Sequence, residues 1–398
     1  MNRPTFSYFL GLIALFWLSC ATSDSQQSTS QLAESPAVFV ANPQAVPEQE
    51  VTTLELGMEA PDFHLPGADG NWYDLKDFDQ AKVLTIIFSC NHCPTAQAYE
   101  QRMFDLDRDY KQQGVQVVVI SPNSPLGLLY EELGYSDMGD TYSDMVLRAR
   151  DKKYPFPYLY DGDDHAASLQ YGPAATPHCF VFDEARKLQY VGRLDKSEKP
   201  GTGQAEDVRA AIEAVLAGQN PETAMTKTFG CSTKWAWKTK YKTKVDAEWA
   251  AMNVSLKPID LAGVKQVVAN TSSKLRLINV WATWCGPCKI EYPEFIAIHR
   301  MFKGRDFEFV SISADDPEYH EKALEFLTEK QSAVSNYRFG KEDIYDLIEV
   351  IDPNWNGALP YTLLVEPGGT IAYAHQGSID PLTIKRAIVE HKMIGRYY

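Results

Sequence analysis

The chain has 398 residues, of which 44% are hydrophobic and 23% are charged, and its formal net charge is −15. This length and hydrophobic content suffice for more than one buried core, so two folded domains are expected. The negative charge argues against a nucleic-acid partner, because phosphate binding needs clustered Lys and Arg. The one basic cluster, KWAWKTKYKTK at residues 234–244, is interpreted as a solvated linker or strand edge rather than a nucleic-acid or membrane surface.

The first twenty residues have the features of an export signal. Arg3 is the only basic residue, and an apolar run at 8–18 is too short to predict a spanning helix. The LSC ending at 18–20 resembles a bacterial lipoprotein signal, in which Cys20 would carry the lipid; an ordinary cleaved signal or a retained anchor is the alternative. Residues 21–50, rich in Ser, Gln, Ala and Pro, are predicted to be a flexible tether. We therefore expect an exported protein in the periplasm or cell envelope, anchored to a membrane through lipid.

The first predicted domain, residues 51–218, alternates strands and helices. Hydrophobic periodicity and turn residues predict the following elements in chain order. They are a hairpin at 60–78, a strand at 81–89, a helix at 95–114, a strand at 115–124, a helix ending at 150, a strand at 156–161, a strand-turn-strand at 175–195 and a helix at 205–218.

The same order recurs in residues 251–398, after a predicted linker at 219–250. The predicted elements are a strand at 274–285, a helix at 289–304, a strand at 306–316, a helix at 317–330, a hairpin at 358–377 and a closing helix at 380–395. Each half is therefore expected to be an α/β domain with a mixed sheet and helices on both faces, and the two domains to follow in tandem.

Four of the seven cysteines form two Cys-x-x-Cys pairs, 90/93 and 285/288, each where a predicted strand ends and a helix begins. At such a junction the first thiol lies near unpaired helix N–H groups, which favour the thiolate. The second thiol can then attack a mixed disulfide and release the partner. Zinc binding, a static disulfide and core packing are the alternatives, and zinc is disfavoured because no second ligand pair is placed to complete four-fold coordination.

The motif WCGPCK around Cys285 and Cys288 resembles the thioredoxin active site, and WATWCGPCKIEYP resembles the exported TlpA and ResA-like branch over roughly residues 254–398. The resemblance implies that Cys285 is the exposed nucleophile and Cys288 the resolving thiol. It also implies that Pro287 restricts the loop and that Trp284 shields it.

Three further positions are assigned by the same resemblance. Pro360 in GALPYT matches the cis-proline that faces the disulfide, and Pro293 matches the proline that kinks the active-site helix. Glu291 matches a carboxylate typical of the branch, one helical turn past the resolving thiol, where it would manage protons. Asn279 replaces the buried Asp of cytosolic thioredoxins.

The stretch CNHCPT at the first pair lacks the preceding Trp and the Gly-Pro interior. Its His92, as an imidazolium, would favour a nearby thiolate. Together with a Thr-Pro step at Pro177, residues 56–218 resemble the peroxiredoxin-like branch of the thioredoxin superfamily. By analogy with the second pair, Cys90 is predicted to attack and Cys93 to resolve.

A thiol-dependent peroxidase, supplied with electrons by the second domain, is the runner-up interpretation. The peroxiredoxin motif Pro-x-x-x-Thr/Ser-x-x-Cys is met with neither Cys90 nor Cys93 as the reactive thiol. The sequence Cys93-Pro94-Thr95 does resemble the Cys-Pro-Thr found at a peroxidatic cysteine. Arg193 is a candidate for the arginine that orients the peroxide in that family. A non-enzymatic scaffold with thioredoxin folds is the third interpretation.

The remaining cysteines have weaker signatures. Cys179 is predicted to be a small buried strand residue, and Cys231, in the predicted linker, is a candidate relay or resolving thiol. The function expected from the sequence is thiol-disulfide exchange with protein disulfides or dithiols and with a membrane or envelope reductant, with hydroperoxides as a second substrate class. It requires no cofactor and no metal.

Overall fold

The computed structural model describes residues 39–340 and 343–396. The predicted signal, with Cys20, lies outside these residues, and within them no helix combines the length and apolarity that a bilayer crossing needs. Part of the predicted tether is packed rather than free. The Phe39 ring lies 4.7 Å from that of Tyr142, and the Asn42 backbone N–H donates to Asp163 at 2.9 Å.

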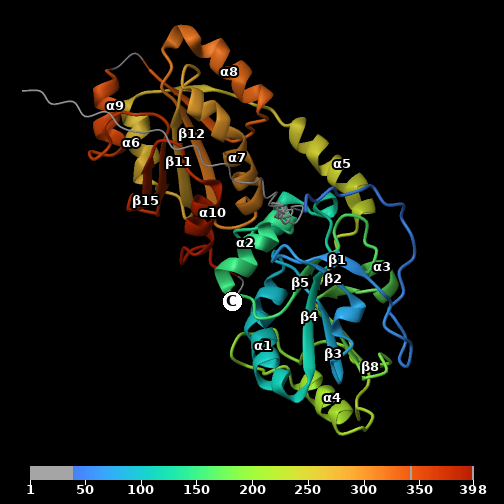
Figure 1. Ribbon diagram of the computed structural model, residues 1–398. Helices are drawn as coiled ribbons and strands as arrows, with labels where there is room; N and C mark the ends of the chain where they lie inside the picture. Colours follow the sequence, from blue (N-terminus) through green and yellow to red (C-terminus); the bar gives the residue numbers. More distant parts are fainter. Residues whose placement is uncertain (1–38, 341–342, 397–398) are drawn as a thin grey trace, which may run out of the picture. The chain divides into compact units, whose positions relative to one another are not determined.

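The first domain is built around a five-stranded mixed sheet (Figure 1). Its elements are β1 (His64–Pro66), β2 (Trp72–Asp74), β3 (Val83–Phe88), α1 (Pro94–Tyr110), β4 (Val115–Ser121), α2 (Tyr142–Lys152), β5 (Tyr158–Tyr160), α3 (Ser168–Tyr171), β6 (Ala175–Thr176), β7 (His178–Phe182), β8 (Leu188–Gly192) and α4 (Glu206–Leu216). The strand order is β5-β4-β3-β7-β8, with β3, β4 and β5 parallel and β7 and β8 antiparallel to their neighbours.

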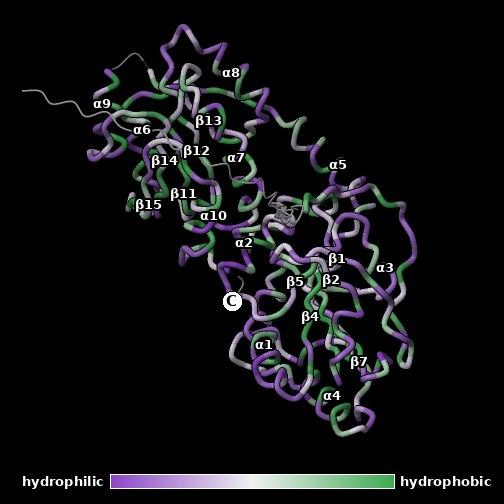
Figure 2. The backbone as a smooth tube through the Cα atoms, in the orientation of Figure 1, coloured by the Kyte–Doolittle hydropathy of each residue, from purple (hydrophilic) through white to green (hydrophobic). Residues whose placement is uncertain are grey.

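Both faces of this sheet are buried, which explains why β3 and β4 read as almost continuous apolar runs. Val83 and Ile87 pack on one face with α1 and α4, whereas Leu84 and Ile86 point to the other face. Figure 2 shows β4 in hydrophobic colours along its length. The carboxyl end of β3 is thereby held rigidly where the first Cys pair begins.

The second domain has a six-stranded mixed sheet. Its elements are β10 (Lys257–Ile259), α6 (Leu261–Ala269), β11 (Leu275–Trp281), α7 (Gly286–Phe302), β12 (Phe307–Ser313), α8 (His320–Glu329), β13 (Ser335–Phe339), α9 (Ile344–Ile351), β14 (Tyr361–Val365), β15 (Ile371–Gln376) and α10 (Pro381–Val389). The strand order is β10-β13-β12-β11-β14-β15, and only β14 and β15 run antiparallel to their neighbours.

Helices cover both faces of this sheet as well. Apolar residues of α7, α8 and α10 pack on one face, and those of α6 and α9 pack on the other. The predicted fold class, two α/β domains with mixed sheets flanked by helices, is confirmed. The sequence reasoning did not predict β10, α6, β13 or α9.

The predicted linker contains a short strand, one turn of 3-10 helix (Ala236–Lys238) and an α-helix. β9 (Cys231–Ser232) pairs antiparallel with β6 of the first domain, and α5 (Thr239–Ala250) includes most of the basic cluster. The cluster therefore forms a helix rather than a strand edge. Lys234, at its start, is buried and forms an ion pair with Glu132 at 2.5 Å.

Candidate functional site: two cysteine pairs at strand-to-helix junctions

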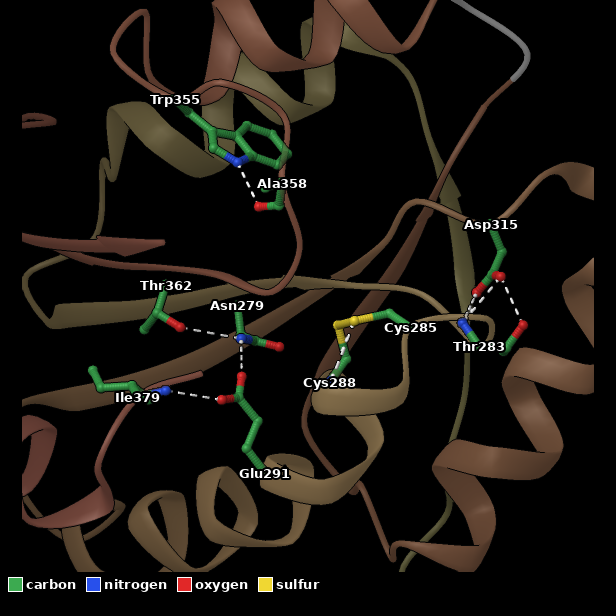
Figure 3. Close-up of a disulfide and its surroundings, with 10 residues drawn as sticks. All are labelled: Asn279, Thr283, Cys285, Cys288, Glu291, Asp315, Trp355, Ala358, Thr362 and Ile379. Atoms are coloured by element: carbon green, nitrogen blue, oxygen red, sulfur yellow. Dashed lines mark hydrogen bonds between the residues drawn. A yellow bond between two sulfur atoms is a disulfide. The ribbon is translucent and has the colours of Figure 1, made fainter. Parts of the chain in front are cut away.

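In the second domain, β11 ends at Trp281 and α7 begins at Gly286, so the Cys pair lies on the first turn of α7 (Figure 3). Cys285 is the N-cap residue, and its Sγ accepts the Cys288 backbone N–H at 3.3 Å. The two cysteines form a disulfide, with their Cα atoms 5.3 Å apart. An N–H aimed at Cys285 Sγ, together with the positive end of the helix, stabilises a thiolate at Cys285 once the disulfide is reduced.

Glu291 lies one turn further along α7 and is buried, with 7% of its surface exposed. It accepts the Ile379 backbone N–H at 3.1 Å and a long contact of 3.5 Å from the Asn279 amide, which also donates to Thr362 (Figure 3). Burial raises the pKa of Glu291 to about 7, and these two hydrogen bonds only partly oppose the shift. The carboxyl group is thus able to take up or release a proton near neutral pH.

The loop before Cys285 is braced by Asp315, which follows β12. Its carboxylate accepts the backbone N–H of Thr283 at 2.9 Å and the Thr283 hydroxyl at 2.8 Å, and Ser313 donates to it at 2.8 Å. No motif in the sequence indicated Asp315. The available signal was its position directly after a buried parallel strand, at the edge where β11 also ends.

The remaining predicted residues of this site lie in α7, directly before Cys285 and directly before β14. The Leu359-Pro360 peptide bond is cis, and Trp355 donates to the Ala358 carbonyl at 2.9 Å, which orders the preceding loop (Figure 3). Pro287 lies in the first turn of α7, and Pro293 lies inside the same helix. Trp284 is 66% exposed and presents apolar surface next to Cys285 in the chain, and its shielding role stays a prediction. Cys285 itself is only 5% exposed, so the prediction of an exposed nucleophile is wrong for this oxidised state.

In the first domain, β3 ends at Phe88 but α1 begins only at Pro94. Cys93 is therefore the N-cap residue, with Pro94 in the first turn, where a missing N–H costs nothing. Cys90 lies before the helix. The prediction that the first cysteine of each pair lies at the helix start holds for Cys285 and is wrong for Cys90.

A buried ion pair braces the loop between the two cysteines. His92 Nδ1 lies 2.5 Å from Asp140, whose carboxylate also accepts the backbone N–H groups of Asn91 and His92 and the side-chain amide of Asn123. Burial opposes a charge on His92, but Asp140 outweighs it and raises the pKa of His92. Burial likewise opposes ionisation of Asp140, and His92 outweighs it and lowers the pKa of Asp140.

The pKa values of the two cysteines in the first pair shift in opposite directions. Burial raises the pKa of Cys90 well above that of a free thiol. Burial acts against ionisation of Cys93 too, but hydrogen bonds from the thiols of Cys231 and Cys90 and the charge of His92 lower its pKa well below the usual value. Burial also raises the pKa of Cys179, which lies within β7. Cys93 is therefore the thiol most readily ionised in this domain.

The chain brings two further groups to this site. The Thr176-Pro177 bond is cis, and Thr176 Oγ1 lies 3.2 Å from Cys90 Sγ. The Cys231 backbone N–H donates to Cys93 Sγ at 3.4 Å. Asp140 and Cys231 lie far from the pair in sequence. No local pattern indicated Asp140, whereas Cys231 was a candidate relay or resolving thiol, expected on a linker that moves rather than at a fixed position beside Cys93.

The donor atoms of Cys90, His92 and Asp140 lie within 4.8 Å of one another, a separation that a metal ion could bridge. The Asp140 oxygens already accept four hydrogen bonds from the loop and from Asn123. A metal ion would have to displace several of these hydrogen bonds. The hydrogen bonds themselves explain why the three side chains lie together, since they hold the cysteine loop in place.

The two sheets correspond to two matches with one family of proteins. The model of the AhpC/TSA family matches residues 56–191 and 248–374, and the chain belongs to this family. The repeated match agrees with the predicted tandem arrangement of a peroxiredoxin-like and a TlpA-like domain.

Several named proteins are similar to parts of the chain. Thiol-disulfide oxidoreductase ResA of Oceanobacillus iheyensis is 28% identical over 103 residues, covering 26% of this chain and 50% of that protein. Thiol:disulfide interchange protein CycY of Rhizobium leguminosarum is 30% identical over 137 residues, covering 32% of this chain and 64% of that protein. The chain thus spans about half to two thirds of the length of these relatives. Among solved structures, a hypothetical protein of Sinorhizobium meliloti is 33% identical, with a TM-score of 0.41, covering 46% of this chain and 96% of that one.

Proposed function

We propose that the protein is a thiol-disulfide oxidoreductase with two redox-active cysteine pairs that exchanges disulfides with protein partners. The Cys285–Cys288 disulfide at the first turn of α7, beside a buried carboxyl group that titrates near neutral pH, carries this proposal. The relatives named as thiol-disulfide oxidoreductases and interchange proteins support it.

The geometry of the second pair suits reversible exchange. A partner thiolate attacks Cys285 Sγ, the Cys285–Cys288 bond breaks, and Cys288 leaves with the electron pair and takes up a proton. In the reverse direction, Cys288 loses that proton and attacks the mixed disulfide. Glu291, one turn away on α7, is the group we assign to this proton exchange, because its pKa of about 7 keeps both its forms populated.

A groove of about 360 Å³ lies beside this disulfide. Its lining is mixed: Trp284, Phe339, Trp355 and Leu359 contribute apolar surface, and Asp315 and Asp316 are among the polar groups. An exposed Trp284 next to Cys285 provides a surface on which a peptide chain can dock. A protein is therefore the partner that we assign to this site, and an envelope protein is the proposed source or acceptor of electrons.

In the first pair, Cys93 takes the role of the attacking thiolate, in contrast to the assignment made from sequence. It is the N-cap of α1 and the thiol whose pKa is lowered, whereas burial keeps Cys90 protonated. Cys90 is then the resolving thiol of the Cys90–Cys93 disulfide. The exchange itself uses only thiols, so no cofactor is needed at either pair.

Reduction of a self-quenched fluorescent disulfide by dithiothreitol tests the proposal. We expect a Cys285→Ser/Cys288→Ser variant and a Cys90→Ser/Cys93→Ser variant each to lose part of the catalysed rate, and the variant with all four substitutions to fall to the uncatalysed rate. A Cys179→Ser variant is the matched control and should keep full activity. Full activity in the fourfold variant would contradict the proposal.

A peroxidase activity of the first domain is the second candidate, and the low pKa of Cys93 favours it. The thiolate would attack a hydroperoxide, release the alcohol or water and become a sulfenic acid, which Cys90 would condense to a disulfide with loss of water. Arg193, the predicted peroxide-orienting residue, instead donates to Asp207 at 2.7 Å. Rapid, saturable loss of the Cys93 thiol with hydrogen peroxide would establish this activity, and oxidation at the rate of an ordinary thiol would exclude it.

Export and lipid anchoring are the final part of the proposal, and they rest on the signal-like residues 1–20. Cys20 would carry the lipid and the following residues would hold the domains at the surface of a membrane. Labelled fatty acid should be incorporated into the expressed chain and not into a Cys20→Ser variant. Equal labelling of both would contradict the assignment.

A further inference from the structure

Residues 230–236 of the predicted linker are fixed to the first domain. Within this segment, β9 pairs antiparallel with β6, with Cys231 opposite Thr176 and Ser232 opposite Ala175. Beyond the strand, the Thr233 hydroxyl donates to the carbonyl of Pro173 at 2.7 Å. The segment therefore adds a strand to the short edge that immediately precedes the cis-proline.

The far end of the segment is held as firmly. The Lys234 backbone N–H donates to Asn123 at 2.8 Å, and its carbonyl accepts the Ser124 N–H at 2.8 Å. The Ala236 N–H donates to Nε2 of His165 at 2.8 Å. Before Cys231, the Thr228 hydroxyl donates to the Pro177 carbonyl at 2.9 Å. Anchors on both sides of Cys231 therefore place its thiol by the fold, in contrast to a thiol on a mobile linker.

Gly230 permits the close approach of this segment. Its φ of +134° is a conformation that residues with a side chain rarely adopt. A Cβ atom there would lie 2.1 Å from the carbonyl oxygen of Thr176. Any side chain at position 230 would push the backbone away from β6 and move Cys231.

The position of Cys231 is next to the first cysteine pair. Its backbone N–H donates to Cys93 Sγ at 3.4 Å, and its side chain packs against the buried cluster of Cys90, Cys93 and Ala96. Cys93 Sγ also lies 3.2 Å from the Thr176 carbonyl oxygen, on the residue opposite Cys231. Cys93 thus has a cysteine neighbour on each side, one from its own loop and one from β9.

We propose that Cys231 is a third redox thiol of the first site and that it exchanges with Cys90 for the disulfide to Cys93. This inference deepens the proposed function and rests on it. Starting from the Cys90–Cys93 disulfide, the Cys231 thiolate attacks Cys93 Sγ; the Cys93–Cys231 bond forms and the Cys90–Cys93 bond breaks. Cys90 leaves with the electron pair and takes up the proton that Cys231 lost, so no outside oxidant or reductant is consumed.

This exchange gives the first site an internal partner. β9 already occupies the edge of β6, where the strand of a protein substrate would otherwise pair. A disulfide held between Cys93 and Cys231 leaves Cys90 free. An external protein strand gains the edge of β6 only when residues 230–233 leave it.

Disulfide mapping in the full chain tests the inference. A Cys285→Ser/Cys288→Ser background removes the second pair, and diamide supplies the oxidising equivalents. After an acid quench, blocking with N-ethylmaleimide and trypsin digestion, Cys90 and Cys93 are on one peptide, residues 83–102, and Cys231 is on another, residues 228–234. The Cys90–Cys93 disulfide therefore stays within one peptide, whereas the Cys93–Cys231 disulfide cross-links two.

We expect both products in this background and only the cross-linked product when Cys90→Ser is added. Cys179, fully buried in β7, should be recovered as a free thiol, and Cys179→Ser should leave the pattern unchanged. Adding Gly230→Ala to the Cys90→Ser chain should cause loss of most of the cross-link, because it displaces β9. The same change alone should leave the Cys90–Cys93 product intact, and a cooperative urea transition of this variant shows that the domain is folded.

Free Cys93 and Cys231 in the oxidised Cys90→Ser chain would overturn the inference, and so would a cross-link that survives Gly230→Ala unchanged. The Cys231→Ser chain distinguishes a failure of the role proposed for Cys231 from a failure of the redox function proposed for the first pair. If it forms the Cys90–Cys93 disulfide, the first pair is redox-active whether or not Cys231 takes part. If it does not, the proposed function of that pair fails.

Discussion

Cys93 is the residue that we expect to be ionised in the reduced first site at neutral pH. In the Cys285→Ser/Cys288→Ser chain, absorbance near 240 nm should report about one thiolate at about pH 6, where an ordinary thiol with a pKa of about 8.5 is protonated. Cys93→Ser should abolish this signal, because burial disfavours ionisation of the remaining thiols, Cys90, Cys179 and Cys231. Cys179→Ser should leave it unchanged, and a signal that persists without Cys93 would contradict the assignment.

Glu291 should make the stability of the second domain depend on pH. Its pKa rises from 4.5 to about 7 on folding, because the carboxyl group is buried. The folded domain holds this proton to higher pH than the unfolded chain does, so the free energy of unfolding falls as the pH rises from about 4.5 to about 7 and stays lower above it. A rise from 4.5 to about 7 corresponds to about 3 kcal/mol at about 1.4 kcal/mol per pKa unit, and solvent screening reduces the expected loss to on the order of 2 kcal/mol.

Glu291→Gln should remove this loss, so the variant should be more stable than the parent at about pH 8 and similar to it at about pH 4. The measurement is the urea concentration at which half of each protein is unfolded. Unfolding of the second domain is detected by hydrogen exchange in the peptide that contains β11. Glu294→Gln, an exposed position on the same helix, is the matched control and should retain the parental pH dependence. If the urea midpoint changed equally with pH in the Glu291 variant and in its parent, the prediction would be refuted.

At the scale of elements, local pattern predicted the strands and helices whose apolar faces are long and regular. β3, β4, β11 and β12 have near-continuous apolar runs, and a cysteine pair marks the junctions of β3 with α1 and of β11 with α7. β13 (SNYRF) lacks such a run, because only part of its length is buried and polar residues alternate within it. β9 has two residues and depends entirely on its partner β6, so no local signal could reveal it.

The start of α1, at the first cysteine pair, is likewise not determined by local sequence. The motif alone located both cysteine pairs, and in α7 it also located the N-cap. In α1 the N-cap is displaced by one turn, to Cys93, where the loop is held by Asp140. Asp140 is 48 residues beyond His92 in the chain, so the position of the N-cap follows from a tertiary contact rather than from the spacing of the cysteines.

Asp140→Asn should therefore destabilise the first domain and weaken its thiolate. Removing one partner of a buried ion pair typically costs about 3 to 5 kcal/mol. Without the carboxylate, His92 loses the charge that helps to ionise Cys93, so the pKa of Cys93 should rise. The urea midpoint reported by the β3 peptide should fall, while that of the β11 peptide stays constant. An unchanged β3 midpoint would exclude the bracing role.

At the scale of the whole molecule, the numbers of thiols at the two sites differ. The second site has two, which can pair completely, whereas the first brings together Cys90, Cys93 and Cys231. Three thiols form one disulfide and leave one over, whichever pair is joined. A fully oxidised chain should accordingly keep a free thiol in the first domain.

The odd number of thiols at the first site predicts how many free thiols the oxidised protein contains, and this number can be measured. Of the seven cysteines, Cys20→Ser leaves six, and the two disulfides leave two free thiols, Cys179 and one at the first site. Titration of the oxidised, denatured Cys20→Ser chain with a thiol reagent should find these two, and adding Cys231→Ser should reduce the number to one. Four free thiols would mean that the first site does not oxidise, and none would mean that Cys179 pairs with the remaining thiol; either count would contradict the arrangement of sites derived from the fold.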